Sequence, residues 1–370
     1  MSTAHRFFSD QSYWNTPLPA DAPVADRNDH FIELLRRSHA EVGFHLNTQQ
    51  WTIPIYEVDE ETPRVSISRR LPDHIGEGRF LYEHSKPTLT PDHPVGHAPG
   101  FGPTIPMPTA AEPDAMTDGH LTLIDRRAQQ AWDLWGAAQR EDGSWWCCSG
   151  ITYALDGPGV FDPTEFAIRN GESIHLYGPC RAAGVPNIAG LVLYHEIQRG
   201  RIEHKLAFAT RFAALLEHDA PATWTDGGIP GGIPEGITIQ LDPALDLSPF
   251  SLSPAALIIA RALQEYGAVL VDVALGSTLS VESVNGHADR TWDGTLSDRD
   301  LHNLPFEHFR FLDPGPTIQK GMIPSIHPII FQTYHEYMNL HPEKTTTDGD
   351  TIVGWPKEWH TQLVEKFTAS

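Results

Sequence analysis

Short apolar runs, separated by clusters of Pro, Gly and polar residues, dominate the pattern along the chain. Runs of roughly four to eight such residues, bounded by turn-forming residues, are typical of β-strands. The 31 prolines and 30 glycines are spread along the sequence, without a repeat of fixed period or a low-complexity tract. The pattern predicts a mostly-β fold, a β-sandwich or jelly roll with a few peripheral helices, and disfavours a solenoid or regular propeller.

Helical signals are few, and the clearest covers residues 254–266. Ser253 can cap this helix, Pro254 suits its first turn, and Gly267 ends it. The apolar run that follows at once predicts a buried strand. Two further helices are predicted at 29–40, with Asn28 as the cap, and at 356–367.

The chain of 370 residues is expected to form one domain. In this prediction residues 1–117 are irregular and loop-rich and pack on a β core at about 118–312, and residues 313–370 form a C-terminal extension. Within the first part, 70–117 is rich in Pro, Gly and His and shows little periodicity. A loop of that length in a compact domain is usually functional or flexible.

Two stretches change from one local pattern to another. Residues 120–135 predict a β-hairpin in which Leu121 and Leu123 share a face of the first strand, and Trp132 and Leu134 share a face of the second. The stretch GLVLYHEIQRGRIEHKLAF (190–208) predicts a short helix at 191–199, ended by Gly200, and a strand at 201–208.

The 190–208 stretch does not fit a zinc-protease helix, which places a second His four residues after the first. Arg199 occupies that position after His195, and the next His is His204. His204 falls on an otherwise apolar strand face with Ile202 and Leu206. Such a histidine is most often a core residue with a satisfied hydrogen bond; the functional alternative is an acid/base or a ligand on a cleft wall.

Composition and charge narrow the classes of function. Apolar residues make up 40% of the chain, which is ample for a core, and the net charge of −22 reflects 48 acidic against 26 basic residues. No basic run resembles a phosphate-binding footprint, so we expect no nucleic-acid partner. No apolar run reaches membrane length and no signal peptide is visible. The expectation is a soluble protein with no membrane partner, extracellular if the chain is a mature form and cytoplasmic if its N-terminus is native.

The three cysteines exclude a disulfide-scaffold protein. Cys147 and Cys148 are contiguous, and contiguous cysteines do not easily reach the geometry of an unstrained disulfide. We therefore predict no bridge between them, which leaves a bond from either one to Cys180 open.

Four segments in order carry a resemblance to a known group of proteins. They are SYWNTPLPADAPV (12–24), DGHLTLIDRRAQQAWDLW (118–135), the 190–208 stretch and ARALQEYGAVLVD (260–272). Together they resemble a widespread, largely uncharacterised group of mostly secreted bacterial proteins. That group typically reads YWN, then D-G/R-H at a hairpin, G-L…E-I-x-x-G-x-I-x-H-A-L, and A-L-x-x-Y-G. The resemblance spans roughly 12–310; this chain departs from it in lacking a signal peptide and in having Lys205 where Ala is usual.

The resemblance implies a shared fold and extracellular ancestry, and by analogy a carbohydrate-active protein. Its motifs map onto Asp118, His120, Glu196, His204 and Tyr266, and the strand after the helix predicted at 254–266 adds Asp272. Each has a structural interpretation beside the functional one. Asp118 is equally typical of a turn that bonds its local backbone, and Glu196 near a helix end is more often solvated than catalytic.

Glycan cleavage needs a proton donor and a second group at the anomeric carbon, commonly paired carboxylates. The candidates are Asp118, Asp133, Glu196, Glu235 and Asp272. A lyase would use His120, His204 or Tyr266 as base and Arg201 or Arg211 to neutralise the substrate carboxylate. Plentiful tryptophans would suit a glycan cleft, although most large aromatic residues belong to cores.

We expect no cofactor; the least unfavourable ligand set for a divalent metal is Asp118, His120 and His204. The Gly-rich GGIPGGIPEG (227–236) lacks dinucleotide-binding spacing and is interpreted as a turn-rich loop.

The sequence thus predicts an enzyme that hydrolyses a glycan substrate by carboxylate acid/base chemistry. Its predicted catalytic residues are Asp118, His120, Glu196 and His204, and its predicted substrate-binding residues are Trp135, Tyr266 and Asp272. Two alternatives stay open: a polysaccharide lyase with a His or Tyr base, and a non-catalytic glycan-binding or surface-structural module. Convergent carboxylates with shifted pKa values would favour an enzyme.

Overall fold

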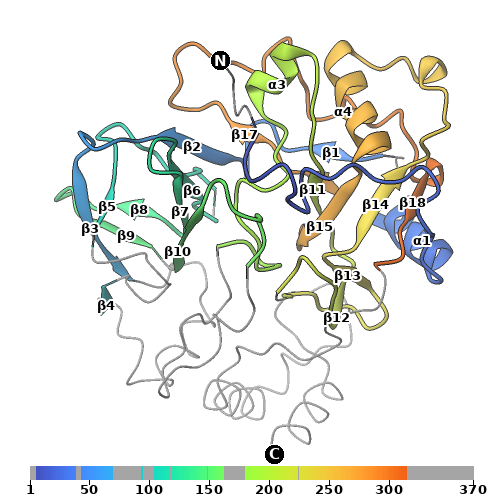
Figure 1. Ribbon diagram of the computed structural model, residues 1–370, viewed down its shortest axis with the longest axis horizontal. Helices are drawn as coiled ribbons and strands as arrows, with labels where there is room; N and C mark the ends of the chain where they lie inside the picture. The colour runs from blue at the N-terminus through green and yellow to red at the C-terminus, as the bar shows by residue number, and fades with distance from the viewer. Residues whose placement is uncertain are drawn as a thin grey trace, which may run out of the picture.

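A computed structural model describes residues 6–38, 43–69, 93–94, 104–116, 118–147, 149–161, 180–223 and 225–314. Strands in several sheets make up most of its regular structure, so the predicted mostly-β class is confirmed (Figure 1). The α-helices in these ranges are α1 (Asn28–Ser38), α3 (Tyr194–Arg199) and α4 (Pro254–Glu265), with short 3-10 turns at Ser248–Phe250 and Phe306–His308.

Sheet one is mixed and has the strand order β1-β16-β11-β15-β14-β18. Its central pair, β11 and β15, runs parallel, and β15 is antiparallel to β14. The strands are β1 (His45–Leu46), β16 (Thr278–Leu279), β11 (Leu206–Ala209), β15 (Ala268–Asp272), β14 (Thr238–Leu241) and β18 (Phe309–Phe311).

Sheet two has the order β10-β7-β6-β2-β17. Because β17 follows β16 after two residues, one short segment supplies strands to both sheets. The parallel pairing of β2 with β6 brings an N-terminal strand into the middle of this sheet. Its strands are β10 (Ser149–Ala154), β7 (Gln130–Trp135), β6 (Leu121–Asp125), β2 (Ile53–Glu57) and β17 (Glu282–Ser283).

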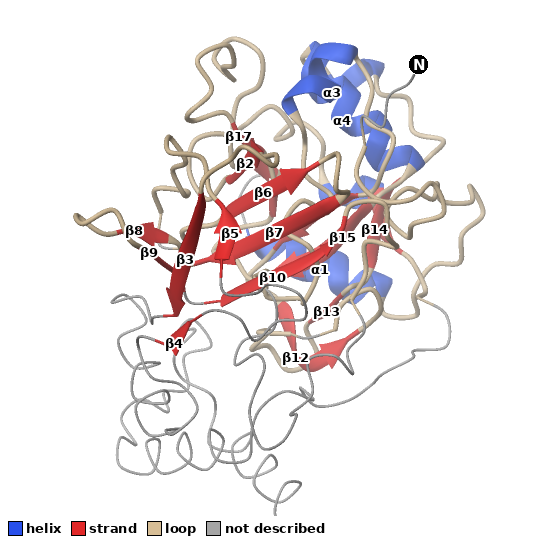
Figure 2. Ribbon diagram, turned by 60° about the vertical axis from the view of Figure 1, so that its left-hand side comes forward, coloured by secondary structure: helices blue, strands red, loops and turns tan. Residues whose placement is uncertain are grey.

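Two smaller sheets complete the fold. Sheet three follows the path β4-β3-β9-β8, with β5 also paired to β3, and β12 pairs with β13 in a separate ribbon. Figure 2 shows the strands of sheet two between those of sheet three and sheet one. The strands are β3 (Arg64–Arg69), β4 (His93–Pro94), β5 (Thr104–Pro106), β8 (Ala138–Gln139), β9 (Trp145–Cys147), β12 (Ala213–His218) and β13 (Ile233–Glu235).

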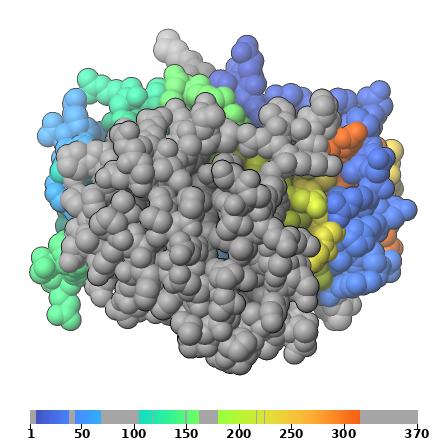
Figure 3. Space-filling model, turned by 90° about the horizontal axis from the view of Figure 1, so that it is seen from below, coloured from blue at the N-terminus to red at the C-terminus, as the bar shows by residue number. Residues whose placement is uncertain are grey.

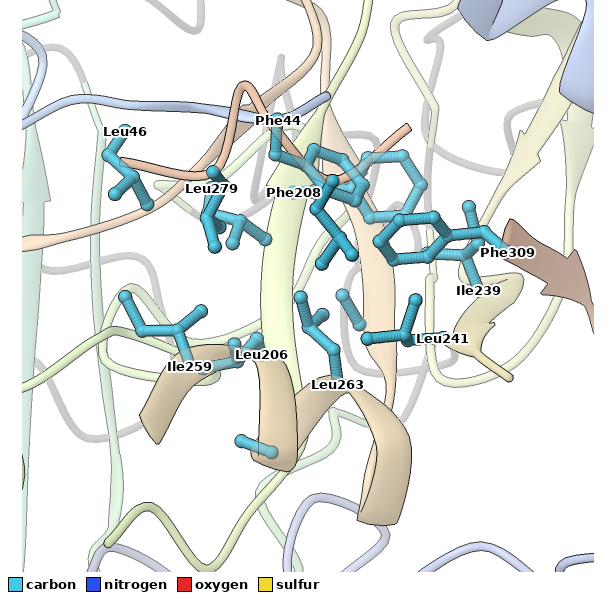
Figure 4. Close-up of a cluster of buried hydrophobic side chains, with 14 of the residues drawn as sticks. Phe44, Leu46, Leu206, Phe208, Ile239, Leu241, Ile259, Leu263, Leu279 and Phe309 are labelled. Carbon is cyan, nitrogen blue, oxygen red and sulfur yellow. The ribbon is translucent and has the colours of Figure 1, made fainter. Parts of the chain in front are cut away.

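Strand alternation separates the hydrophobic core into layers. Leu206 and Phe208 of β11 face a cluster that includes Ile259 and Leu263 of α4 (Figure 4). The alternate residue Ala207 joins a second cluster between sheets one and two. A third cluster lies between sheets two and three. Period-two side-chain direction therefore places a core on both faces of the central strands.

Local sequence signals account for several elements. The Ser253 side chain accepts a hydrogen bond from the amide of Ala256 at 3.1 Å, which confirms it as the N-cap of α4. Gly267 follows that helix with φ +74°, a conformation that favours glycine. Helix α1 overlaps the predicted 29–40 but begins at Asn28, the residue predicted to be its cap, and the hairpin predicted at 120–135 forms as β6 and β7. The helix predicted at 356–367, and most of the loop predicted at 70–117, lie outside the described residues.

The 190–208 stretch folds partly as predicted. Helix α3 ends at Arg199, and Gly200 adopts φ +86° and caps it, as expected. The predicted strand at 201–208 is too long, because β11 begins only at Leu206 and the preceding residues form no ladder.

The structure corrects one further sequence prediction and confirms another. The 227–236 segment is not entirely a turn-rich loop, since it contains the buried strand β13, whose last residue is Glu235. Cys147 and Cys180 are buried and neither forms a disulfide, so Cys147 has no bridge to Cys148 or to Cys180.

Candidate functional site

Four carboxylates from separate elements lie near the C-terminal end of β15. Asp272 ends that strand, Glu235 ends β13, Asp226 precedes β13, and Asp118 precedes β6. These four carboxylates interact electrostatically with one another: Asp226 interacts with Glu235, and both Asp118 and Asp226 interact with Asp272. We refer to Asp118, Asp226, Glu235 and Asp272 as the carboxylate cluster.

Glycines hold the backbone that carries this cluster. A Cβ on Gly227 would lie 2.2 Å from the carbonyl oxygen of Ala214, and one on Gly236 would collide with the backbone of Asp219. The chain on either side of Asp226 and Glu235 therefore packs against other backbone so closely that only glycine fits. Glu217 of β12 pairs at 3.3 Å with Arg27, which precedes α1. Seen from below in Figure 3, the yellow-green surface of this region lies beside the blue surface of the N-terminal segment.

Burial and mutual repulsion shift the protonation of the cluster. Desolvation is the largest cause in each case: it raises the pKa of Asp226 to about 7, and the pKa values of Glu235 and Asp272 well above their ordinary range. The negative charge of Asp226 adds to the shift of both partners. Asp226 is accessible to solvent as a residue, yet its carboxylate lies among enough protein atoms to be desolvated. Carboxylates placed so close together cannot all ionise at neutral pH.

Glu235 is the least satisfied member of the cluster. It is fully buried, and neither carboxylate oxygen has a hydrogen-bond partner within the part of the chain that the structure describes. Thr225 and the amide of Asp226 lie close enough to oppose the rise in its pKa without completing such a bond. A buried carboxyl group without partners is costly in the charged form, so Glu235 retains its proton at neutral pH.

His218 lies beside Glu235. The two residues are register partners across the parallel pair β12 and β13, so their side chains share a face. His218 is buried, and within the described residues both ring nitrogens lack a hydrogen-bond partner, although the backbone of Ala222 approaches the ring. Burial lowers its pKa, so the ring is neutral near pH 7 and offers one donor and one acceptor.

Arg181 is the buried counter-ion of the site. Its guanidinium donates to the carbonyl of Ala189 at 3.0 Å and to the Ser280 hydroxyl at 2.8 Å. Burial lowers its pKa, whereas Asp272 and Asp133 act in the opposite direction. The positive charge of Arg181 favours ionisation of Asp272 over ionisation of Glu235, whose pKa it does not lower.

Asp133 connects this region to sheet two and is fully hydrogen-bonded. It accepts from the Thr122 hydroxyl at 2.8 Å, the Tyr153 hydroxyl at 2.9 Å and the backbone amide of Asn187 at 2.7 Å. Desolvation nevertheless raises its pKa to about 6. The Asn187 side chain is buried beside it, and among the described residues neither of its polar atoms has a partner.

His120 lies at the rim of β6 with its ring buried. Burial lowers its pKa to about 4; the charge of Asp118 opposes this shift and that of Arg181 adds to it. The ring is therefore neutral at physiological pH. The turn that holds it requires Gly119, with φ +49°, because a Cβ there would lie 3.1 Å from the Ala137 carbonyl oxygen.

Glu196 and His204 form a separate buried pair. The Nε2 of His204 lies 2.9 Å from a carboxylate oxygen of Glu196, and its Nδ1 lies 2.8 Å from the carbonyl oxygen of Lys205. Burial lowers the pKa of His204, but the charge and hydrogen bond of Glu196 outweigh it, so the pKa is raised. Arg199 also lies 3.7 Å from the second oxygen of Glu196. His204 is thus bonded through both ring nitrogens, whereas the Oε1 of Glu196 is buried without a hydrogen-bond partner among the described residues.

The structure does not bring the four predicted catalytic residues together. In the parallel pair β11 and β15, Leu206 faces Ala268 and Ala209 faces Asp272. His204 precedes Ala209 by five residues, which corresponds to roughly 16 Å of extended chain. Asp118 interacts electrostatically with both His120 and Asp272, which places the three at the C-terminal end of β15. Glu196 belongs to α3, which Figure 1 shows away from the arrowhead of β15, and His204 bonds to Glu196.

The predicted binding residues are divided in the same way. Half-buried Trp135 ends β7 next to Gly136, whose amide donates to the carbonyl of Asp118 at 2.7 Å. Tyr266 lies at the start of β15, where its hydroxyl meets Arg201. Asp272 belongs to the carboxylate cluster. The ligand set considered for a metal, Asp118, His120 and His204, is divided too, and no group of three or more His, Cys, Asp or Glu in the described ranges is arranged to hold a metal ion.

Sequence reasoning missed Asp226, Arg181, His218 and Asn187. Arg201, one of the two cations proposed to neutralise a substrate, instead pairs on the surface with Glu203 and Glu265. Arg211 lies over the ring of Phe212. The only local signal for Asp226 is its place before Gly227, which is equally typical of an ordinary turn.

Comparison of the chain with protein-family models, with curated proteins and with solved structures finds no match. Within the described residues, no helix has both the length and the apolar character needed to cross a membrane.

Proposed function

We propose that this protein is a glycoside hydrolase whose acid/base chemistry is carried out by the carboxylate cluster. The observation that supports this most directly is the convergence of Asp226, Glu235 and Asp272 from separate elements, with their pKa values raised by burial and by one another. Closely placed carboxyl groups with unequal affinity for protons are what hydrolysis of a glycosidic bond requires.

Different environments assign different roles to Glu235 and Asp272. Among the described residues, Glu235 is buried without a bonded partner at either oxygen and no cation lowers its pKa, so it holds a proton and acts as the general acid at the leaving oxygen. The pKa of Asp272 is also raised well above its ordinary value, but Arg181 opposes this rise, and for this reason we assign Asp272 to the anomeric carbon, where it acts as the carboxylate. Asp226 raises the pKa of both groups and keeps Glu235 protonated.

The lyase alternative has less support from these environments. Of its three proposed bases, His204 bonds through its ring nitrogens to Glu196 and Lys205, and the hydroxyl of Tyr266 meets Arg201, so neither belongs to the carboxylate cluster. The buried arginine of the site donates to a carbonyl and a hydroxyl of the protein rather than facing an open position. A purely binding module would have no need to retain several destabilising carboxyl groups in one place.

A panel of polysaccharides tests the proposal. Cleavage is read as new reducing ends, and ultraviolet absorbance of an unsaturated product identifies a lyase instead. We expect reducing ends without absorbance, lost in Glu235→Gln and Asp272→Asn and retained in Glu141→Gln, which changes an exposed carboxylate in the turn between β8 and β9. Cleavage that survives both cluster variants would refute the assignment.

A further inference from the structure

Three buried side chains around the carboxylate cluster lack hydrogen-bond partners in the described part of the chain. They are Glu235, Asn187 and His218. A protonated carboxyl group, an amide and a neutral imidazole each offer both a donor and an acceptor, so these side chains can bind a ligand group of either kind. The carboxyl groups of Asp118, Asp226 and Asp272 add further acceptor oxygens, and a ligand with a positive charge would favour their ionised form.

Carboxyl groups in the site outnumber the cations that could compensate them. The cluster contributes four carboxyl groups and Asp133 a fifth, whereas within the described ranges Arg181 is the one buried arginine or lysine that interacts with them. Its donors already bind Ala189 and Ser280. Buried carboxylates are stable when a cation or several donors compensate them, and that compensation is incomplete here.

We propose that the glycan bound at this site carries free amino groups, so that a sugar ammonium lies among Asp226, Glu235 and the unpartnered side chain of His218. This inference rests on the proposed function and names its substrate class. An ammonium group brings three donors and a positive charge to carboxyl groups that have one compensating arginine among the described residues. Its N-acetylated counterpart brings one donor, an additional acceptor and no charge, and a hydroxyl brings no charge.

The charge of the whole molecule acts in the same direction. A net charge of −22 attracts a polycation over long range and repels a polyanion. The attraction between exposed charges weakens with salt, because the Debye length shortens as ionic strength rises. Binding of an amino glycan is therefore expected to weaken as salt increases, whereas binding of a neutral glycan changes little.

Calorimetry on the Glu235→Gln variant tests the inference without cleavage of the ligand. The probes are glucosamine oligomers, the same oligomers N-acetylated, and glucose oligomers of the same linkage. We expect the amino series to bind about tenfold to a hundredfold more tightly than the N-acetylated series, as for hydrogen bonds to charged groups. Adding Asp226→Asn should remove most of this preference, and adding Glu141→Gln should leave it unchanged.

The outcomes separate this inference from the proposed function. Tight, salt-sensitive binding of the amino series without cleavage by the unsubstituted protein would support the ligand class and refute the hydrolase. Cleavage of neutral or N-acetylated glycans with equal or greater efficiency would keep the hydrolase and overturn the amino-glycan inference. Absence of a preference for the amino series in the binding measurements would also overturn it.

Discussion

The two ends of the central strands β11 and β15 contain buried charges in opposite conditions. At one end, His204 and Glu196 bond to each other, and the second nitrogen of His204 bonds to a backbone carbonyl. At the other end, Glu235 is buried with neither oxygen bonded among the described residues, and its neighbours repel its charge. One end thus holds an ion pair whose members bond to each other, with the second oxygen of Glu196 at 3.7 Å from Arg199, and the other end holds a buried acid without such a pair among the described residues.

The difference in hydrogen bonding between the two ends helps to distinguish structural from functional buried charges. A buried ion pair whose partners are complete has little capacity to bind anything else, and removing one member leaves the other uncompensated. Groups that remain unsatisfied are destabilising, and a protein retains them where a ligand completes them. The comparison therefore assigns stability to Glu196 and His204 and chemistry to the carboxylate cluster.

The largest effect is expected for activity after Glu235→Gln. The substitution preserves shape and removes the proton that the leaving group requires, so turnover should fall by about a hundredfold to ten-thousandfold. The measurement is kcat on the glycan identified by the panel, with circular dichroism to verify folding. Glu141→Gln is the matched control, and near-normal turnover in Glu235→Gln would remove the distinction between the two ends.

The second prediction concerns stability at the opposite end. Glu196→Ala leaves His204 buried without its main partner and should lower the free energy of unfolding by about 3–5 kcal/mol. In Glu196→Gln the cost should be smaller, because neutral His204 can still donate from Nδ1 to the carbonyl of Lys205 and accept at Nε2 from the amide. Denaturant unfolding gives both values.

Measuring the activity of the Glu196 variants completes the test of their structural role. Per folded molecule, kcat of Glu196→Gln should remain within about twofold of the unsubstituted protein, since a change that leaves reacting groups in place has little effect on the barrier. A large loss of turnover in a well-folded Glu196→Gln would instead make this pair part of the active site.

The third prediction is a pH dependence of stability. The pKa of Asp226 rises from an ordinary 3.8 to about 7 on folding, and those of Glu235 and Asp272 rise as well. The folded state then binds more protons than the unfolded state, so the cluster's contribution is greatest below about pH 4 and is lost as pH rises towards 7 and above. Asp272→Asn should therefore raise the melting temperature at pH 8 and not at pH 4.

The pKa of His204 is raised as well, so substitutions are needed to distinguish the contributions of the two ends to the pH dependence of stability. Its raised pKa gives a contribution that is present below its ordinary value of 6.5 and lost as pH rises through the folded value. Glu196→Gln should reduce stability mainly at acid pH, whereas Asp272→Asn should increase it at alkaline pH. Identical profiles for the two variants would contradict the comparison.

Sequence patterns located the elements where local chemistry decides the structure. Ser253 and Pro254 fix the start of α4, Gly200 ends α3, and period-two alternation predicts the hairpin of β6 and β7. These signals depend on neighbours within a few residues. The parallel pairing of β2 with β6 depends on residues far apart in sequence, and no local signal predicts it.

Only part of the candidate site could likewise be predicted from the sequence. Asp118, His120 and Asp272 were identified by motif, and Glu235 by residue type, and the structure places all four at one end of the central strands. Arg181 and Asp226 were missed, since a single Arg or Asp near turns carries no pattern. Glu196 and His204 were grouped with the others because their motif is equally prominent, and a motif does not reveal at which end of a strand it folds.

The smallest effect is expected for Tyr266→Phe, which sharpens the boundary between the two ends. Tyr266 was predicted to bind substrate, but it lies at the start of β15 with its hydroxyl at Arg201, whose charge is shared with Glu203 and Glu265 on the surface. Loss of a hydrogen bond to a solvent-exposed arginine should cost at most about 1 kcal/mol, and the buried ring is retained.

For Tyr266→Phe we expect kcat and KM to stay within about twofold of the unsubstituted protein, whereas Asp272→Asn at the other end of the same strand abolishes turnover. A selective rise in KM with unchanged unfolding would show that substrate reaches the start of β15, because loss of a contact made equally in ground and transition states raises KM alone. In that case the binding surface would extend along the whole strand, and the separation of a structural end from a catalytic end would fail at Tyr266.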